Sequence, residues 1–418
     1  MATEAPLPKF RWIRRGFLAS ATALLIGLFA SILVNRGLGP AGRGTLAILQ
    51  LGVTGIALAF GSGMQGTIVY AVGSGRLSPH RLLSWSLSWS ALVLGLCYLA
   101  RSLGSGGSEG LWRIVPILVA MELASSLLMA IHHGRSDFNF VHVMILISPV
   151  LMLCGVLLLH LFAVIAPGTI LLVQGAVAGT AILLATLRLG KEAPSPRLPP
   201  PAGLAGHALL VYLASLSAFA MYRADLALVS HFLRPADVGL YAVATFLAEK
   251  PWLLSDAVVQ VLFPLAAGGP VDMGRVCRMT FWATLAACGA LAACAAWLVP
   301  LLYGSAYAPV SWLLLWLLPG TVSLGVAKVL AAALAAKGSP SHGFQAGLAS
   351  AALNIPLTIL LIPRFGTAGA ALACSVTYLL AAGFLVVRFL RQEPGTSWPG
   401  LLALRVSDWN RTRPRGTA

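Results

Sequence analysis

Residues 38–47 read LGPAGRGTLA, and residues 233–242 read LRPADVGLYA. Both stretches follow the pattern L-x-P-A-x-x-G-x-x-A, and each one lies between two long apolar runs. A proline fits the first turn of a helix because its missing N–H would have no partner there. A glycine permits unusual backbone angles and lets neighbouring helices approach closely. The repeated pattern predicts a tight external turn between two helices at the same place in two equivalent halves.

The composition excludes a soluble protein of this length. The chain has 418 residues, of which 58% are hydrophobic and 10% are charged, and its mean hydropathy is +0.88. A soluble domain carries about 25% charged residues. A bilayer core of about 30 Å needs about 20 apolar residues per helix, so roughly 35 residues per span and loop allow about twelve spans. We expect an all-α membrane protein with about twelve transmembrane helices and no soluble domain.

Breaks rich in charge, proline or glycine delimit the expected spans, and the longest break divides them into two sets of six. The spans are 16–35, 45–73, 82–100, 112–131, 139–164, 168–187, 205–231, 238–266, 276–302, 308–336, 343–362 and 367–390. The composition of the longest break is that of an exposed linker. We predict an N-terminal lobe at 1–187, a cytoplasmic linker at 188–206, a C-terminal lobe at 207–391 and a basic cytoplasmic tail at 392–418. Because six is even, the lobes are parallel repeats, as in transporters that rock two lobes around a central site.

The net charge of +16 indicates membrane orientation. Of the 28 Lys and Arg residues, 19 fall in loops and tails on the N-terminal side, six on the opposite side and three inside expected spans. This bias predicts that both termini are cytoplasmic. No interleaving of aromatic and basic residues favours nucleic acid as a partner. The first apolar run lacks a small-residue cleavage site, so we interpret it as a retained helix.

Motifs of catalysis are missing from the sequence. It has no phosphate loop, no nucleophile elbow and no His, Asp or Glu group with metal-ligand spacing. Its six cysteines form no CxxC pair and lie mostly in apolar runs, where buried thiols are the ordinary interpretation. We therefore expect no enzyme activity, no cofactor and no metal.

Two stretches carry a family resemblance. RGLGPAGRGTLAI at 36–48 and YRADLALVSHFLRPADVGLYAVATFLAEKPW at 222–252 resemble bacterial polysaccharide flippases. These are lipid-linked oligosaccharide exporters of the MATE-like multidrug/oligosaccharidyl-lipid/polysaccharide exporter superfamily. The resemblance implies a V-shaped pair of six-helix bundles around a central cavity. It also implies transport of undecaprenyl-pyrophosphate-linked oligosaccharide from the cytoplasmic to the outer leaflet of a bacterial inner membrane, with a polysaccharide polymerase or ligase as a candidate partner.

Charged residues inside the expected spans are candidate substrate contacts. A charge at the bilayer centre costs at least about 2.5–3.5 kcal/mol, so such residues should face protein or a wet cavity. Arg binds phosphate with a bidentate fork and Lys with a point charge, which suits a lipid-linked pyrophosphate. The candidates in the second half are Arg223, Asp225, Glu249, Lys250, Asp256 and Lys328.

A structural role for these charges stays open. Arg223 and Asp225 are two residues apart and do not face each other on a helix, so each is expected to bond across to the eighth span. Glu249 and Asp256 are seven apart on that expected span, share a face and are able to neutralise Arg223. Lys328 has no acidic residue within a turn of its own span.

Two further charged residues lie in the first half. Arg36, at the outer end of the first span, either reaches the lipid headgroups or lines the outer mouth of the cavity. Glu122, in the fourth span, is either a coupling-ion ligand or a buried structural carboxyl that shares a hydrogen bond.

Two alternative functions remain. One is a multidrug/cation antiporter of the same superfamily. The resemblance then implies an acidic ion site, often in the first helix, where this chain has no acidic residue. The other is a non-transporting scaffold of a polysaccharide-assembly complex. Translocation of a lipid-linked sugar by the purified protein would exclude the scaffold, and drug efflux that depends on Glu122 and a proton or sodium gradient would favour the antiporter.

Overall fold

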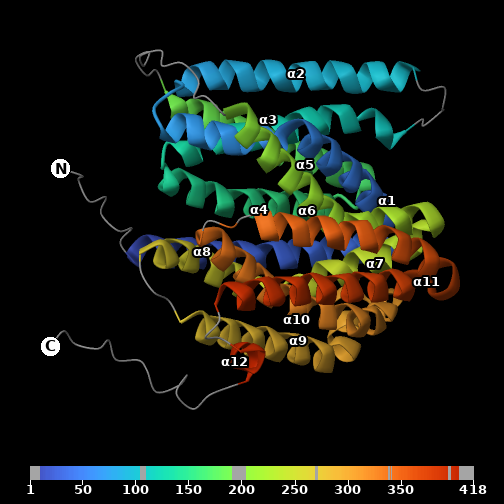
Figure 1. The fold of residues 1–418 in the computed structure, drawn as a ribbon. Coiled ribbons are helices and arrows are strands. Elements are labelled where there is room, and N and C mark those ends of the chain that lie inside the picture. Colours follow the sequence, from blue (N-terminus) through green and yellow to red (C-terminus); the bar gives the residue numbers. More distant parts are fainter. Residues whose placement is uncertain are drawn as a thin grey trace, which may run out of the picture. The chain divides into compact units, whose positions relative to one another are not determined.

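The computed structural model describes residues 10–103, 110–190, 204–268, 272–337, 339, 341–393 and 397–403. The described elements are all helices (Figure 1). The chain divides into two compact units. One contains Met1–Phe219 with Arg234–Gly239, and the other contains Ala220–Leu233 with Leu240–Ala418. The predicted linker at 188–206 lies mostly outside the described residues, and the predicted lobe bounds stay predictions.

The first predicted turn is present but occupies a single residue. Helix α1 (Phe10–Gly73) is interrupted only at Gly39, which has a φ of 65° and a ψ of 175°. Glycine reaches this positive φ without a steric penalty, and Pro40 then starts the next helix with its fixed φ. The expectation that the first span ends at 35 and the second begins at 45 was wrong, because Gly39 is the single non-helical residue between them.

Helix α3 (Val115–Gly134) is the centre of the first unit. Val119, Leu123, Leu127 and Ile131 recur every four residues and are fully buried, so they form one apolar stripe along the helix. Helices α1, α2 (Pro79–Leu103) and α5 (Pro167–Leu189) pack around α3 (Figure 1). The remaining elements of this part are η1 (Leu111–Arg113) and α4 (Phe138–Leu161).

Helix α10 (Pro309–Ala336) has the same central place in the second unit. Sixteen of its 28 residues are buried, as expected for a helix that packs against several neighbours. It packs against α8 (Trp252–Gly268), α9 (Met273–Tyr303) and α11 (Ser341–Gln392). The other elements of the second half are α6 (Leu204–Phe232), α7 (Pro235–Ala248), η2 (Ser305–Tyr307) and α12 (Trp398–Leu402).

The described helices fit twelve spans. Eight helices are long and apolar enough to cross a bilayer. Two of them, α1 and α11, contain two spans each, divided at Gly39 and Gly366. Among the described residues, helix α6 brings the count of spans to eleven, and the broken pair α7 and α8 together brings it to twelve. Counted this way, α3 is the fourth span of the first half and α10 is the fourth span of the second, so the central helix recurs with the predicted internal repeat.

The eighth expected span, 238–266, is broken. Helix α7 ends at Ala248 and α8 begins at Trp252. Pro251 explains the break, because a proline has no N–H to donate and its ring clashes with the carbonyl of the preceding turn. The Trp252 N–H donates to the Glu249 carbonyl at 3.1 Å, which is the tighter spacing of a 3₁₀ turn. The expectation of one continuous helix face carrying Glu249 and Asp256 was therefore wrong.

The repeated glycine is a packing position. The first unit contains residues 38–47 and also Arg234–Gly239 from the second copy of the motif. A Cβ added to Gly44 would lie 1.6 Å from the Pro235 carbonyl oxygen, and one added to Gly239 would lie 2.0 Å from the Pro40 carbonyl oxygen. The proline of each copy thus meets the glycine of the other at backbone contact, where no larger side chain fits.

The predicted basic tail contributes a short helix to the second unit. Arg278, on α9, is 3% exposed and donates a hydrogen bond to the Gly400 carbonyl of α12. The Trp282 indole N–H donates to the Leu402 carbonyl at 2.8 Å. The start of the segment 392–418 is therefore packed against α9, and residues 404–418 lie outside the described residues.

Candidate functional site

The break between α7 and α8 gathers charged side chains from α6, α8, α10 and the turn itself, all in the second unit. We call Arg223, Glu249, Lys250, Asp256 and Lys328 the helix-break cluster. Arg223 comes from α6, Lys328 from α10, Asp256 from the start of α8, and the other two from the turn itself. Helix α7 has 14 residues, or about 21 Å at 1.5 Å per residue. If α7 starts at the outer interface, the turn lies about two thirds of the way through the hydrocarbon core of about 30 Å.

Arg223 and Glu249 form a bidentate ion pair. Arg223 Nη1 lies 2.7 Å from Glu249 Oε1, and Nη2 lies 3.4 Å from Oε2. The two side chains are 36% and 24% exposed, so the pair is reachable without being a surface pair. Two parallel N–H···O bonds fix the plane of the guanidinium. The same fork is able to take two oxygens of a phosphate if Glu249 releases it.

Asp225 has a different role from Arg223. It is 2% exposed, and it accepts hydrogen bonds from the Tyr241 hydroxyl and from the Leu226 N–H. Both carboxylate oxygens are used, one by each donor. Arg223 and Asp225 therefore bond separately to the segment that follows α6, as predicted. Asp225 acts as an anchor between α6 and α7, and the expectation that it is a cavity charge finds no support in its burial.

Lys328 also has an acidic partner, on another helix. Its Nζ lies 2.8 Å from Asp256 Oδ1 and 4.7 Å from the centre of the Trp252 ring. The Asp256 side chain is 47% exposed and that of Lys328 is 21% exposed. The expectation that Asp256 neutralises Arg223 was wrong, because the break in the helix turns Asp256 toward α10 and leaves Glu249 for Arg223.

Lys250 is the member of the helix-break cluster without an ion-pair partner among the described residues. Its Nζ lies 3.6 Å from the centre of the Phe246 ring, which is a cation–π contact. The residue is half-buried and stands two positions before the N-terminus of α8. The positive end of a helix dipole favours a nearby anion. Lys250 is therefore the cation of the cluster that an anion would be able to contact without displacing a carboxylate among the described residues.

Three aromatic rings support the helix-break cluster. The Trp252 ring centre lies 5.5 Å from that of Tyr222 and 6.0 Å from that of Tyr378, within the range of favourable ring pairs. The Trp252 indole N–H donates to the Thr321 carbonyl at 2.9 Å. The rings come from α6, α8 and α11, so they hold the start of α8 between its neighbours. Sequence reasoning missed them, although Trp252 directly after Pro251 was a visible signal of a helix start.

The two candidates from the first half do not belong to this cluster. Arg36 is an exposed residue near the end of the first part of α1, in the first unit. Glu122 lies on an exposed face of α3. Its carboxylate has no hydrogen-bond or ion-pair partner among the described residues, so the interpretation as a buried carboxyl sharing a hydrogen bond was wrong. Among the described residues, no three His, Cys, Asp or Glu side chains are grouped to hold a metal.

Comparison with known proteins identifies the fold. No protein-family profile matches the chain, and no curated protein matches it in sequence. Three solved structures illustrate what it is similar to. The lipid II flippase MurJ, in an inward closed conformation, aligns with a TM-score of 0.65 and 17% identity over 89% of this chain and 86% of its own. A multidrug resistance MATE family transporter of the MOP superfamily, in an inward-facing conformation, aligns with a TM-score of 0.67 and 14% identity over 90% and 100%.

The third is the Vibrio cholerae MATE transporter VcmN in its bent form, with a TM-score of 0.63 and 13% identity over 91% and 96% of the two chains. The TM-scores establish likeness of fold, and identities this low establish nothing more specific. The chain therefore has the all-α membrane fold of MATE-like transporters, which confirms at the level of fold the resemblance carried by residues 36–48 and 222–252.

Proposed function

We propose that this protein is a flippase that moves undecaprenyl-pyrophosphate-linked oligosaccharide from the cytoplasmic to the outer leaflet of a bacterial inner membrane by alternating access. The observation that carries the proposal is the helix-break cluster, in which three cations meet at a break within a membrane-spanning segment. Discontinuous helices of this kind bind charged substrates in other transporter folds. The fold shared with a lipid II flippase supports the same class of cargo.

The chemistry of the cargo fits this cluster. A lipid-linked pyrophosphate is a compact polyanion on a long apolar tail. Its transport needs cations that bind it on one side of the membrane and release it on the other. Lys250 offers an unpaired charge, while Arg223 and Lys328 are paired at 2.7 and 2.8 Å with carboxylates that can compete for them. Charged hydrogen bonds are stronger than neutral ones. Competition by Glu249 and Asp256 keeps the anion from being held too tightly to leave.

The test is translocation of a labelled undecaprenyl-pyrophosphate oligosaccharide in liposomes that contain the purified protein. We expect Lys250→Gln to lower the rate about tenfold or more, because one hydrogen bond to a charged group contributes about 1.5–3 kcal/mol. Lys337→Gln is the matched control, since Lys337 lies near the end of α10, pairs with Glu393 and is outside the cluster. Equal rates for Lys250→Gln and wild type, at equal amounts of folded protein, would exclude the cluster as the substrate site.

A multidrug/cation antiporter is the second candidate, and one observation favours it. The Glu122 carboxylate is exposed and has no partner among the described residues, which leaves it available to a proton or a cation. In liposomes with an imposed proton or sodium gradient, this alternative predicts efflux of a cationic dye that Glu122→Gln abolishes. Translocation of the lipid-linked sugar without dye efflux supports the flippase, and neither activity would support the scaffold.

A further inference from the structure

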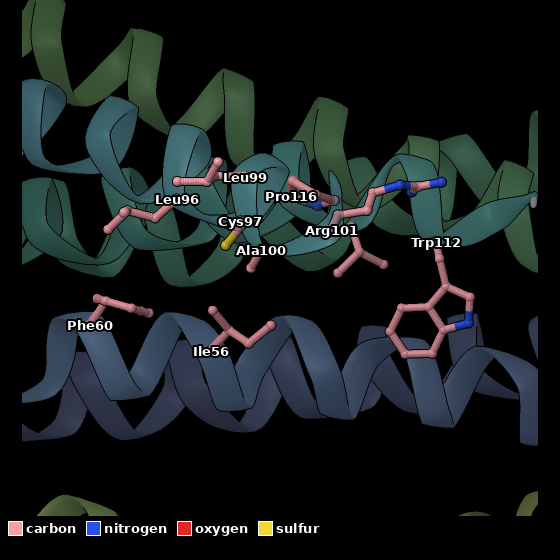
Figure 2. A pocket seen from close by; sticks show the side chains of 10 residues that line it. Ile56, Phe60, Leu96, Cys97, Leu99, Ala100, Arg101, Trp112 and Pro116 are labelled. Atoms are coloured by element: carbon pink, nitrogen blue, oxygen red, sulfur yellow. The ribbon is translucent and has the colours of Figure 1, made fainter. Parts of the chain in front are cut away.

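The first unit contains a cavity that has no role in the proposed function. Its volume is about 600 Å³, and it lies between the second part of α1, helix α2, η1 and the start of α3. Figure 2 shows Ile56 and Phe60 on α1 facing Leu96, Leu99 and Ala100 on α2 across an open space. Known ligand pockets have volumes of about 300–1,000 Å³, mostly apolar linings and a few placed polar groups. The cavity has the size and the lining of a binding site for an apolar group.

The lining is polar at one end only. Arg101 is the single charged residue among the ten that line the cavity. It stands in the last turn of α2, and Trp112 stands in η1, where the chain turns toward the next span. In Figure 2, Trp112 and the Arg101 guanidinium lie toward one end, and Phe60 and Leu96 lie toward the other. Arg and Trp at the end of a spanning helix mark the level of the lipid headgroups, so the apolar end extends to hydrocarbon depth.

The cavity is open to the surface of α2. Leu96 is 41% exposed, Leu99 is 54% exposed and Trp112 is 40% exposed, and all three line it. Helix α2 is one of the eight helices long and apolar enough to span a bilayer, so in a bilayer we expect lipids beside its exposed apolar side chains. A lipid chain therefore has direct access to the cavity from the membrane.

We propose that this cavity binds one acyl chain of an anionic phospholipid, with the lipid phosphate at Arg101. A free phosphate ion would use the guanidinium and leave the apolar walls unused, and a purely apolar molecule would do the reverse. A phospholipid uses both ends of the cavity. Its phosphate lies at headgroup depth, like Arg101, and its acyl chain lies at hydrocarbon depth, like the apolar walls. Burial of the chain against Ile56, Phe60 and Leu96 drives binding, and the charge of Arg101 selects an anionic headgroup.

Photocrosslinking in nanodiscs tests the proposal without a transport assay. The protein is placed in phosphatidylcholine nanodiscs that contain a small fraction of phosphatidylglycerol with a diazirine on one acyl chain. Adducts are then mapped by peptide mass spectrometry. We expect adducts within 56–60 and 96–100, which unlabelled phosphatidylglycerol displaces. The same label on phosphatidylcholine should give about fivefold fewer adducts, equivalent to about 1 kcal/mol for one basic residue near the membrane surface.

Two pairs of variants separate the cavity from general lipid contact. Ala100→Trp fills the cavity and should remove at least nine tenths of the adducts. Its control is Ala91→Trp, because Ala91 is exposed on the same helix and does not line the cavity. Arg101→Gln should abolish the preference for phosphatidylglycerol, whereas Arg113→Gln, with the same loss of charge and outside the lining, should keep it.

Three results would overturn the proposal. These are adducts that persist in Ala100→Trp, equal labelling by the two lipids in wild type, and displacement by inorganic phosphate as effectively as by phosphatidylglycerol. Size-exclusion chromatography reports folding of each variant. If Ala100→Trp does not fold, the comparison of Arg101→Gln with Arg113→Gln decides the matter, and an unchanged lipid preference in Arg101→Gln refutes the site.

Discussion

Breaking the ion pair between Arg223 and Glu249 should separate its structural role from its role in transport. The two charges at about 4 Å attract by about 4 kcal/mol at an effective dielectric constant of 20, before desolvation. Exposed pairs contribute about 0.2–1 kcal/mol, and removing one partner of a fully buried pair costs about 3–5 kcal/mol. These side chains are 36% and 24% exposed, between the two limits. We therefore expect Arg223→Gln or Glu249→Gln to lower the free energy of unfolding by about 2 kcal/mol, and a coupling energy of about 1–2 kcal/mol between them.

A double-mutant cycle measures this coupling. For a unit of 150–250 residues, 1 kcal/mol shifts the melting temperature by about 2–4 °C, so each single variant should melt about 4–8 °C lower than wild type. The double variant should lose about 2–3 kcal/mol, which is less than the sum of about 4 kcal/mol for the two single variants, since no unpaired charge remains. If Arg223 also contacts the substrate, translocation in liposomes stays at least about tenfold below wild type in the double variant.

Two outcomes would refute this reasoning. Additive losses in melting temperature would mean that the bidentate pair contributes nothing to stability. Wild-type translocation by the stable double variant would mean that Arg223 is a structural residue only, and the proposed substrate site would then depend on Lys250 and Lys328.

Three further predictions concern packing and pH. Gly44→Val and Gly239→Val should each abolish accumulation of folded protein, because the added Cβ would lie 1.6 or 2.0 Å from a backbone oxygen. In fluorescence-detected size-exclusion chromatography, the control Gly27→Val should accumulate normally, since its Cβ meets nothing within 4 Å. Deleting 398–418 should lower the melting temperature by several degrees, because the buried Arg278 loses its acceptor on Gly400; an unchanged melting temperature would contradict this. The Arg188 guanidinium lies 3.0 Å from Asp137 and lowers the pKa of that carboxyl. The pair therefore stabilises the protein above the unfolded pKa of about 3.9, and this stabilisation disappears as pH falls through the lowered folded pKa. Arg188→Gln should therefore melt slightly lower than wild type at pH 7 and equally at pH 2, with an effect below about 1 kcal/mol because Arg188 is exposed.

The helical architecture could be predicted from the sequence because hydropathy and helix ends are local signals. Expected spans such as 82–100 and 276–302 differ from the observed helices, Pro79–Leu103 and Met273–Tyr303, by three residues or fewer. The errors arose where a single residue decides the geometry. Gly39 makes a whole turn, and Pro251 breaks a helix inside a run whose apolar residues continue on both sides.

The candidate site was predictable in its residues and not in its contacts. A charge inside an apolar run is visible in the sequence, and five such residues lie together at one break. Which carboxylate meets which cation depends on tertiary packing. Lys328 and Asp256 are 72 residues apart, and their pairing follows from the way α8 restarts after the turn. The aromatic support from Tyr222 and Tyr378 needed the same three-dimensional information.

Under the proposed function, the charge balance of the helix-break cluster would let one site both take up and release an anion. Asp225 already uses both carboxylate oxygens within its own anchor, which leaves three cations facing two carboxylates at the break. The excess charge resides on Lys250, so the proposed pyrophosphate would meet one unopposed cation first. Further contacts require Arg223 or Lys328 to leave its carboxylate, and this exchange offsets much of what the new contact gains. Because the ion pairs would re-form when the anion departs, we expect binding weak enough for turnover, whereas three unpaired cations at the same depth would hold the anion and destabilise the empty protein.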